Sequence, residues 1–382
     1  MKKKEVDVLD NKQLFAKNLK LARVKAGLSQ VKLAEMLSYT GKAISKWESG
    51  YALPPAEILP KLAKILNTDL NSLFDFREEP QYFIGVDGGG TKTKFMMTDR
   101  NGVVINELTL SACNPTSVGV DNSVAVFSDG IKRLCSDIPY GKVSVYIGSA
   151  GCGIKANQEL ILQGLSGLKL SRLQISGDAE NIISAALRGG NGVIAILGTG
   201  SIIYSVYSNT SHRIGGYGHF IGDTFSGTEF GRACLEAVFA DLDKSGSKTI
   251  MTKAVTDING TDVSKMLADM YAEGKTYMAR LAHVVFEAAE KGDKVATEIL
   301  NHNIKRFSAQ LSSALAQLPL DERFDIVLAG GITHFAESFV EELKQNITSS
   351  NLNEIKILGC EPVVGAVLLS GAPEVKEKEK EN

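Results

Sequence analysis

Asp87 and the glycine-rich run behind it are the residues of this chain best suited to a phosphate site. After the apolar segment FIGV the sequence reads Asp87, Gly88, Gly89, Gly90, Thr91, Lys92 and Thr93, and then the apolar segment KFMM begins. Glycine turns let backbone N–H groups approach phosphate oxygens, and Thr hydroxyls add donors. A Walker P-loop or a dinucleotide fingerprint needs a helix after its glycines, whereas a strand pattern follows here. The stretch therefore predicts a strand–turn–strand phosphate site of another kind.

A second turn of the same design occurs more than a hundred residues later. The apolar run GVIAIL leads into Gly198, Thr199, Gly200 and Ser201, and another strand pattern, IIYSVY, follows. Two such units, widely separated in the chain, suggest two similar lobes that face each other across a shared anion.

Asp87 has a separate role in this interpretation, because a carboxylate at a strand end cannot usefully contact phosphate. It can hold a hydrated Mg²⁺, which prefers one or two carboxylates together with waters and phosphate oxygens. Asp87 is therefore the predicted metal ligand.

The whole chain has the composition of an ordinary soluble protein. Its 382 residues are 44% hydrophobic and 23% charged, and no apolar run approaches the roughly 18–20 residues that span a bilayer. We therefore expect a cytoplasmic protein without a membrane partner. The five cysteines form no CxxC pair, which argues against a zinc ribbon or a disulfide framework.

The charge is distributed unevenly, with a basic first part and an acidic remainder. Residues 1–64 hold 13 Lys and Arg against 6 Asp and Glu, while the rest holds 29 against 38. The basic part, after an N-terminal extension at 1–12, reads as closely spaced short helices over 13–74 without a strand signal. Two short helices around a turn of three or four residues are typical of a helix-turn-helix, which places its second helix in the DNA major groove. A small bundle for protein–protein contact is the competing interpretation.

This part also resembles the Xre-type helix-turn-helix family, through LSQVKLAEMLSYTGKAISKWESGYALP and LPKLAKILNTDLNSLF. The resemblance implies DNA as a partner, with a palindromic operator read by a homodimer. It also implies that Ala34, Leu37, Ile44 and Trp47 are packing residues. The residues implied to face DNA are Gln30, Thr40, Lys42, Ser45 and Lys46.

Residues 81–372, behind a charged linker at 75–80, resemble the actin/hexokinase/Hsp70 ATPase superfamily, in its BadF/BadG/BcrA/BcrD and N-acetylglucosamine kinase branch. The matching motifs, in family order, are GVDGGGTKTK, CNPTSVG, SGDAENIISAA, AILGTGSIIY, GGYGHFIGD, VLAGGI and EPVVGAVLLS. The resemblance implies an α/β actin-like ATPase fold of two duplicated lobes, with ATP and Mg²⁺ as cofactors. The expected boundaries are 81–189 for the first lobe and 190–372 for the second, whose C-terminal segment can return to the first. A charged disordered tail at 373–382 completes the expected organisation.

The resemblance also implies roles for single residues. Asp178 matches the carboxylate that accepts a proton from the attacking sugar hydroxyl, although a helix N-cap would explain this aspartate as well. Gly330 and Gly331 match positions close to the adenosine. The positions implied to contact the sugar are Asn114, Asp223, Gly216 and Tyr217.

Three positions depart from the family pattern. Relatives continue after Gly-Asp with Glu-Gly-Ser-Gly, and this chain has Thr224 and Phe225 in the Glu and Gly positions. Gly177 stands where relatives often carry Asn. A neighbouring branch that activates acyl-CoA dehydratases through an iron–sulfur cluster is disfavoured, because its DIGGQD-type second turn is absent and Cys113 and Cys152 are isolated.

Two functions remain open at this stage. One is a sugar-responsive transcriptional regulator that also transfers the γ-phosphate of ATP to an amino sugar such as N-acetylglucosamine. The other is a catalytically inactive sensor of sugar and ATP that acts only through DNA.

Overall fold

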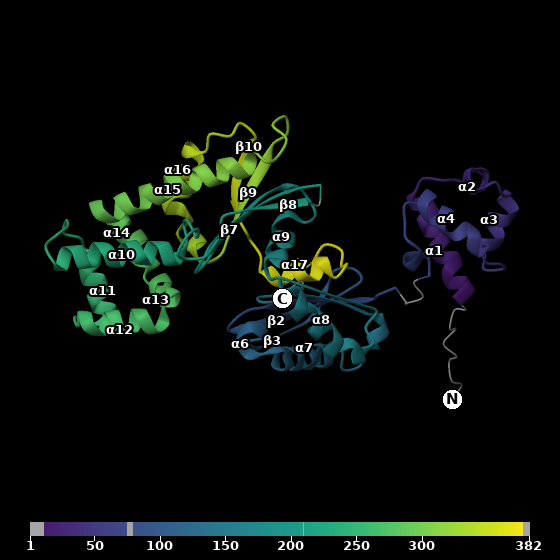
Figure 1. The fold of residues 1–382 in the computed structure, drawn as a ribbon, viewed down its shortest axis with the longest axis horizontal. Coiled ribbons are helices and arrows are strands. Elements are labelled where there is room, and N and C mark those ends of the chain that lie inside the picture. Colours follow the sequence, from purple (N-terminus) through teal and green to yellow (C-terminus); the bar gives the residue numbers. More distant parts are fainter. Residues whose placement is uncertain (1–10, 75–78, 209, 377–382) are drawn as a thin grey trace, which may run out of the picture. The chain divides into compact units, whose positions relative to one another are not determined.

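The computed structural model describes residues 11–74, 79–208 and 210–376, which form two compact units with separate hydrophobic cores (Figure 1). The first unit ends at Glu79 and the second begins at Pro80. This division falls in the predicted linker at 75–80, of which residues 75–78 lie outside the described residues. Residues 1–10 of the predicted N-terminal extension lie outside them too.

The first unit is an all-α bundle, as predicted, and its first helix begins two residues before the expected start at 13. Ser29 and Thr40 accept hydrogen bonds from backbone N–H groups in the first turns of α2 and α3, which fixes where these two helices begin. The helices are α1 (Asn11–Lys25), α2 (Gln30–Leu37), α3 (Gly41–Glu48), η1 (Ala56–Ile58), α4 (Leu59–Ile65) and α5 (Leu70–Leu73).

A buried ion pair ties three of these helices together. Arg23 Nε on α1 donates to Glu48 Oε1 at 2.5 Å, and Gln30 Nε2 on α2 donates to Glu48 Oε2 at 2.8 Å. The Glu48 side chain, at the end of α3, is only 3% exposed. The position of α3 relative to α1 and α2 is therefore set by charge-assisted hydrogen bonds as well as by apolar packing.

The second unit contains two five-stranded sheets of the same design. In the first sheet the order is β3-β2-β1-β4-β5, and in the second it is β8-β7-β6-β9-β10. In each sheet the central strand pairs antiparallel with the strand that follows it and parallel with a later strand. The strands are β1 (Tyr82–Gly88), β2 (Lys92–Asp99), β3 (Val104–Ser111), β4 (Val143–Ser149), β5 (Arg172–Ser176), β6 (Gly192–Leu197), β7 (Ser201–Tyr207), β8 (Thr210–Ile214), β9 (Phe324–Ala329) and β10 (Leu352–Ile357). This repeat confirms the predicted fold of two duplicated lobes.

Helices cover both sheets, and each lobe has its own core. The helices of the first lobe are α6 (Pro115–Val118), α7 (Val120–Leu134), η2 (Tyr140–Lys142), α8 (Lys155–Leu165), η3 (Ser166–Leu168) and α9 (Ala179–Leu187). Those of the second are α10 (Gly227–Leu242), α11 (Met251–Asn259), α12 (Val263–Glu273), α13 (Lys275–Arg280), α14 (Ala282–Glu290), α15 (Lys294–Leu315), η4 (Gly331–Ser338) and α16 (Val340–Asn346). Within the described ranges, no helix is long and apolar enough to cross a membrane.

The last helix, α17 (Pro362–Leu369), returns to the first lobe and packs on β1 and α9 (Figure 1). Behind it, Lys376 forms a parallel bridge with Val103, and its N–H donates to Gly102 O at 2.8 Å. The prediction of a disordered tail from residue 373 is therefore wrong for residues 373–376, because this segment adds to the edge of the first sheet. Residues 377–382 of that tail lie outside the described residues.

Candidate functional site

The first glycine turn joins β1 to β2 and is held in shape by backbone hydrogen bonds. Gly89 N donates to Lys92 O at 2.9 Å, and Ala150 N donates to Gly88 O at 2.8 Å. A side chain at Gly88 would run into Cys113 and Ser149, so only glycine fits there. Because neighbouring segments hold the carbonyl oxygens, the turn is a rigid backbone cradle suited to an anion.

The second turn, between β6 and β7, is built in the same way. Gly198 N donates to Gly200 O at 2.9 Å, which closes the turn. The first backbone N–H groups of α10 hold its carbonyl oxygens, with Gly227 N donating to Gly198 O at 2.8 Å and Thr228 N to Thr199 O at 3.1 Å. The helix start thus fixes the second cradle, as the loops after β3 and β4 fix the first.

The hydroxyls of the two turns fall into two kinds. Thr91 and Thr199 are exposed, and their hydroxyls can reach a ligand. Thr93 is fully buried and donates to Ser111 O at 2.7 Å, while Ser201 donates to Thr224 O at 2.6 Å. The prediction that Thr93 and Ser201 offer hydroxyls to phosphate is corrected accordingly: both hold the flanking strands in place.

Asp87 lies one residue before the end of β1 and is half-buried, between the buried Val86 and Gly88. Burial and the nearby charges of Asp178 and Glu361 raise the pKa of its carboxyl, whereas a hydrogen bond from Asn181 opposes the shift. A neighbouring cation would stabilise the ionised form of such a carboxylate, so the residue fits Mg²⁺. Within the described part of the chain, no three His, Cys, Asp or Glu side chains gather around a common point. An ion at Asp87 would therefore complete its shell with waters and phosphate oxygens.

Asp178 stands at the N-cap position of α9, one residue after the glycine that follows β5. Its side chain makes no capping hydrogen bond, so the competing explanation of this aspartate as a helix cap is not realised. The carboxyl is accessible to solvent, yet the protein around it desolvates it enough to raise its pKa. Hydrogen bonds from the backbone N–H groups of Asp178 and Ala179 partly oppose this rise in pKa. An accessible carboxylate with a raised pKa suits a general base.

Two predicted sugar contacts lie beside these carboxylates and turns. Asn114 caps α6 through its oxygen, which accepts from Thr116 N at 3.0 Å, and its amide N–H groups remain able to donate. Asp223 lies against Gly200 of the second turn, where an added methyl group would come within 2.6 Å of its Oδ2. Its Oδ1 accepts from Gly218 N at 3.0 Å. The structure therefore brings Asp223 to the edge of the phosphate cradle.

The other two predicted sugar contacts belong to the loop that leads to Asp223. Gly216 has a φ of 68°, and a Cβ there would lie 2.8 Å from Ile202, so the backbone alone accounts for this glycine. Tyr217 is 68% exposed, with the Arg213 guanidinium 5.3 Å from its ring centre. Tyr217 can reach a ligand, whereas Gly216 can offer only backbone atoms.

The departures from the family pattern differ in their structural setting. Thr224 is buried, and Arg306 and Gln310 donate to its hydroxyl at 3.4 Å, so it is a packing residue of the second lobe. Gly177 has Gly153 as its nearest neighbour, 3.7 Å from an added Cβ, so a side chain fits there. The Asn that relatives carry is therefore not excluded by space at position 177.

A cavity of about 420 Å³ opens directly beside the second turn. Sequence reasoning found Gly198, Thr199 and Gly331 at this place and missed the side walls. These walls come from helices far along the chain, so no local sequence signal marks them. The residues missed are Gly227, Ala279, Ala282, His283, Ile332 and Phe335. A cavity of this size and apolar character, starting at the second glycine turn, fits a nucleoside.

The two glycines predicted near the adenosine play different parts. Gly330 has a φ of 102°, and a side chain on it would collide with the backbone of Leu197, so this glycine is required by the fold. Gly331 lines the cavity and has nothing within 4 Å of an added Cβ.

We therefore expect Gly331→Ala to weaken nucleotide binding several-fold without a loss of thermal stability. The added methyl group occupies free space in the unliganded protein and intrudes only where a nucleoside would lie. Calorimetric titration with an ATP analogue and thermal unfolding measure the two quantities. Gly330→Ala is the contrasting variant, because it should lower stability first.

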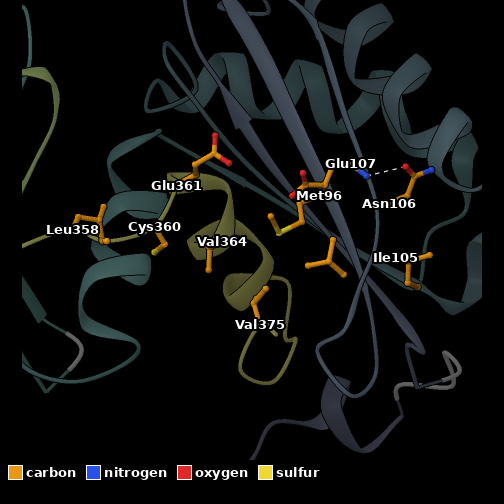
Figure 2. Close-up of a pocket in the computed structure, with 11 residues that line it drawn as sticks. Met96, Ile105, Asn106, Glu107, Leu358, Cys360, Glu361, Val364 and Val375 are labelled. Atoms are coloured by element: carbon orange, nitrogen blue, oxygen red, sulfur yellow. Dashed lines mark hydrogen bonds between the residues drawn. The ribbon is translucent and has the colours of Figure 1, made fainter. Parts of the chain in front are cut away.

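A larger cavity, of about 770 Å³, lies outside this site between the β2–β3 hairpin and the segment that opens α17 (Figure 2). Its polar lining includes Glu107 and Glu361, and the nearby Lys94 ammonium pairs with both carboxylates. Since the cation is already engaged and the carboxylates repel anions, this cavity does not suit a nucleotide.

In the first unit, the residues predicted to face DNA keep to the surface. Lys42, Ser45 and Lys46 are exposed on α3, and Thr40 is exposed at its N-cap. Gln30 is half-buried and donates to Glu48, which orients its amide group at the start of α2. The residues predicted to pack are buried, namely Ala34, Leu37, Ile44 and Trp47.

The comparison with known families covers both units. A sequence model of the BadF/BadG/BcrA/BcrD ATPase family matches residues 84–370, which is most of the chain. The chain belongs to this family. A helix-turn-helix model matches residues 19–73 of the first unit. The protein is therefore a helix-turn-helix domain joined to a BadF-type ATPase domain.

Several known proteins and solved structures resemble the ATPase domain or the whole chain. An N-acetyl-D-glucosamine kinase of Dictyostelium discoideum is 28% identical over 313 residues, covering 76% of this chain and 98% of the relative. A crystal structure from Chromobacterium violaceum, named "Putative N-acetylglucosamine Kinase", aligns with a TM-score of 0.63 and 25% identity over 76% of this chain and 99% of that one. A ROK family transcriptional regulator, a homologue of the E. coli MLC protein, shares the fold over 94% of this chain and 96% of its own, with a TM-score of 0.51 and 12% identity.

Proposed function

We propose that this protein is a sugar-responsive transcriptional regulator whose ATPase domain transfers the γ-phosphate of ATP to an amino sugar such as N-acetylglucosamine. The observation that carries the proposal is the pair of matching glycine turns, with Asp87 and Asp178 beside the first of them. The same chain also has a helix-turn-helix in its first unit. The Dictyostelium relative, named as an N-acetyl-D-glucosamine kinase, supports the choice of substrate class.

Phosphoryl transfer requires the protein mainly to position the reacting groups and to stabilise charge. The two cradles hold the polyphosphate of ATP, and the sugar lies between Asn114, Asp178 and Asp223. Asp178 accepts the proton of the sugar hydroxyl as the hydroxyl oxygen forms a bond to the γ-phosphorus and the bond to ADP breaks. Mg²⁺ beside Asp87 would neutralise charge that builds up on the phosphate oxygens. The nucleoside occupies the cavity next to the second turn.

In this proposal the first unit regulates transcription by binding DNA. The exposed Lys42 and Lys46 on α3 suit contact with a DNA major groove, and a homodimer would present two such helices to a palindromic operator. Lobes of this fold can close around ligands, and closure would change how the two DNA-binding units are presented. The neighbour that shares the fold over nearly the whole chain is described as a transcriptional regulator, which supports this output.

A sensor without catalysis is the second candidate, and one observation favours it. The position at which relatives carry Glu is Thr224, whose side chain is buried and turned toward Arg306 and Gln310. The substrate wall is changed there, and a binding site can tolerate such a change more easily than an enzyme that must orient its substrate to within fractions of an ångström.

One experiment separates the two candidates. ADP release is followed with a panel of amino sugars and neutral sugars, and binding of the full-length protein to promoter DNA is measured with and without each sugar. Turnover above the ATP-only rate with an amino sugar, together with sugar-dependent DNA affinity, is the expected result. Sugar-dependent DNA binding without turnover would leave the sensor, and DNA binding indifferent to every sugar would refute the regulatory role.

A further inference from the structure

We propose that Asn181, on the inner face of α9, is a positioning residue that fixes the carboxylate of Asp87 for metal binding. The inference rests on the proposed role of Asp87 and concerns a residue that takes no part in the chemistry itself.

Asn181 is fully buried, and its amide nitrogen reaches three oxygens at the carboxyl ends of two strands. Nδ2 donates to Asp87 Oδ1 at 2.8 Å, and Gly148 O and Val86 O lie 3.0 and 3.3 Å away. One side chain thus links α9 to β1, to β4 and to the carboxylate. All three neighbours can only accept, so the nitrogen of the amide must face them.

The surroundings of Asn181 are shaped to allow this contact. A side chain on Gly148 would collide with the Asn181 amide, and one on Gly365 would collide with its backbone, so both neighbours are glycine. Asn181 Oδ1 is buried without a hydrogen-bond partner among the described residues, which destabilises the folded protein. An apolar residue would avoid that cost, which points to the donated hydrogen bonds as the reason for an amide here.

The position of Asn181 on its helix adds a second consequence. Asp178 lies at the N-cap of α9, and Asn181 N donates to Asp178 O at 3.1 Å in the first turn of that helix. The contact with Asp87 therefore sets the distance between the proposed metal ligand and the proposed base. Residues that orient a metal ligand from behind typically change metal affinity by 10- to 100-fold when they are replaced.

The test measures metal affinity directly in the full-length protein. Free Mn²⁺ is titrated by electron paramagnetic resonance in the presence of a non-hydrolysable ATP analogue. Asn181→Leu keeps the approximate volume of the side chain and removes the donor, and we expect it to weaken Mn²⁺ binding about 10- to 100-fold. In turnover assays the same variant should need more Mg²⁺ for half-maximal rate and recover part of its kcat at saturating Mg²⁺.

A matched control is available in the second lobe. Asn303 on α15 is also a buried helical asparagine, and among the residues that the structure describes its Oδ1 has no partner and its Nδ2 donates within its own helix, to Ile299 O. Asn303→Leu should leave Mn²⁺ affinity unchanged. If Asn181→Leu proves poorly folded, Asn181→Ala replaces it in the titration.

A folded Asn181 variant with the Mn²⁺ affinity of the unaltered protein would overturn the inference, as would an equal loss in the Asn303 variant. Unaltered protein that holds no Mn²⁺ beside the nucleotide would overturn both the inference and the role of Asp87. The titration requires no sugar, so absence of sugar phosphorylation would refute the enzymatic proposal alone and leave this test decisive.

Discussion

Asp178→Asn is expected to lower kcat for sugar phosphorylation by about 10²- to 10⁴-fold, the usual contribution of a general base. Asparagine has the same shape and cannot accept the hydroxyl proton at neutral pH. Asparagine keeps a side-chain oxygen that can accept from the backbone N–H groups of Asp178 and Ala179 at the start of α9, so the substitution should preserve the local structure. ADP release with saturating sugar and ATP measures the effect, and thermal unfolding should show little change.

The pH dependence of kcat/KM tests the role of Asp178 as a general base independently. The pKa of Asp178 is raised by partial desolvation, and the residue must be ionised to act as a base. The acid limb of kcat/KM should therefore lie above the ordinary pKa of an aspartate, and activity should fall as the pH drops through it. Asp129→Asn, at an exposed position on α7, is the control and should keep both rate and profile. An Asp178→Asn variant that keeps most of the kcat would show that Asp178 is not the general base.

The strand–turn–strand structure around both glycine turns could be predicted because its signals are local. An apolar run, a few small residues and a second apolar run specify a strand, a turn and a strand with little help from the rest of the chain. The structure places all of these within one or two residues of the expected positions.

Features that depend on contacts between residues far apart in the sequence could not be predicted in this way. Ala279 and His283 line the proposed nucleoside cavity because α13 and α14 pack near the second turn, about 80 residues away in sequence. Asn181 reads as an ordinary polar residue in a helix, and its contact with Asp87 joins residues 94 positions apart. Likewise, nothing local distinguished the exposed Thr91 from the buried Thr93, since the outcome depends on the partner strand β3.

Phe225 combines full burial with a strained backbone, and its replacement should have the largest effect on stability. Its φ is 65°, in the left-handed region that costs roughly 1–2 kcal/mol for a residue other than glycine. Its ring stacks on Phe307 with 4.8 Å between centroids and meets Phe230 and Phe339 edge-on at 5.0 Å. Aromatic packing in the second core therefore holds a conformation that glycine adopts freely, at the position where relatives carry glycine.

We expect Phe225→Ala to destabilise the protein by about 3–5 kcal/mol, as is usual for removal of a buried phenylalanine. Phe225→Gly should destabilise the protein by about 1 kcal/mol less than Phe225→Ala, because glycine relieves the backbone strain that alanine retains. Thermal or urea unfolding of the ATPase domain in the full-length protein measures both variants.

The stacked partner Phe307 supplies the control, because it lies inside the regular helix α15. There glycine should be the worse replacement, by about 1 kcal/mol relative to alanine, since helix interiors disfavour glycine. The order of the two variants should therefore reverse between two rings that touch each other. An identical order at both positions would mean that the left-handed backbone at Phe225 stores no strain, and the substitution of the family glycine would then be a matter of packing alone.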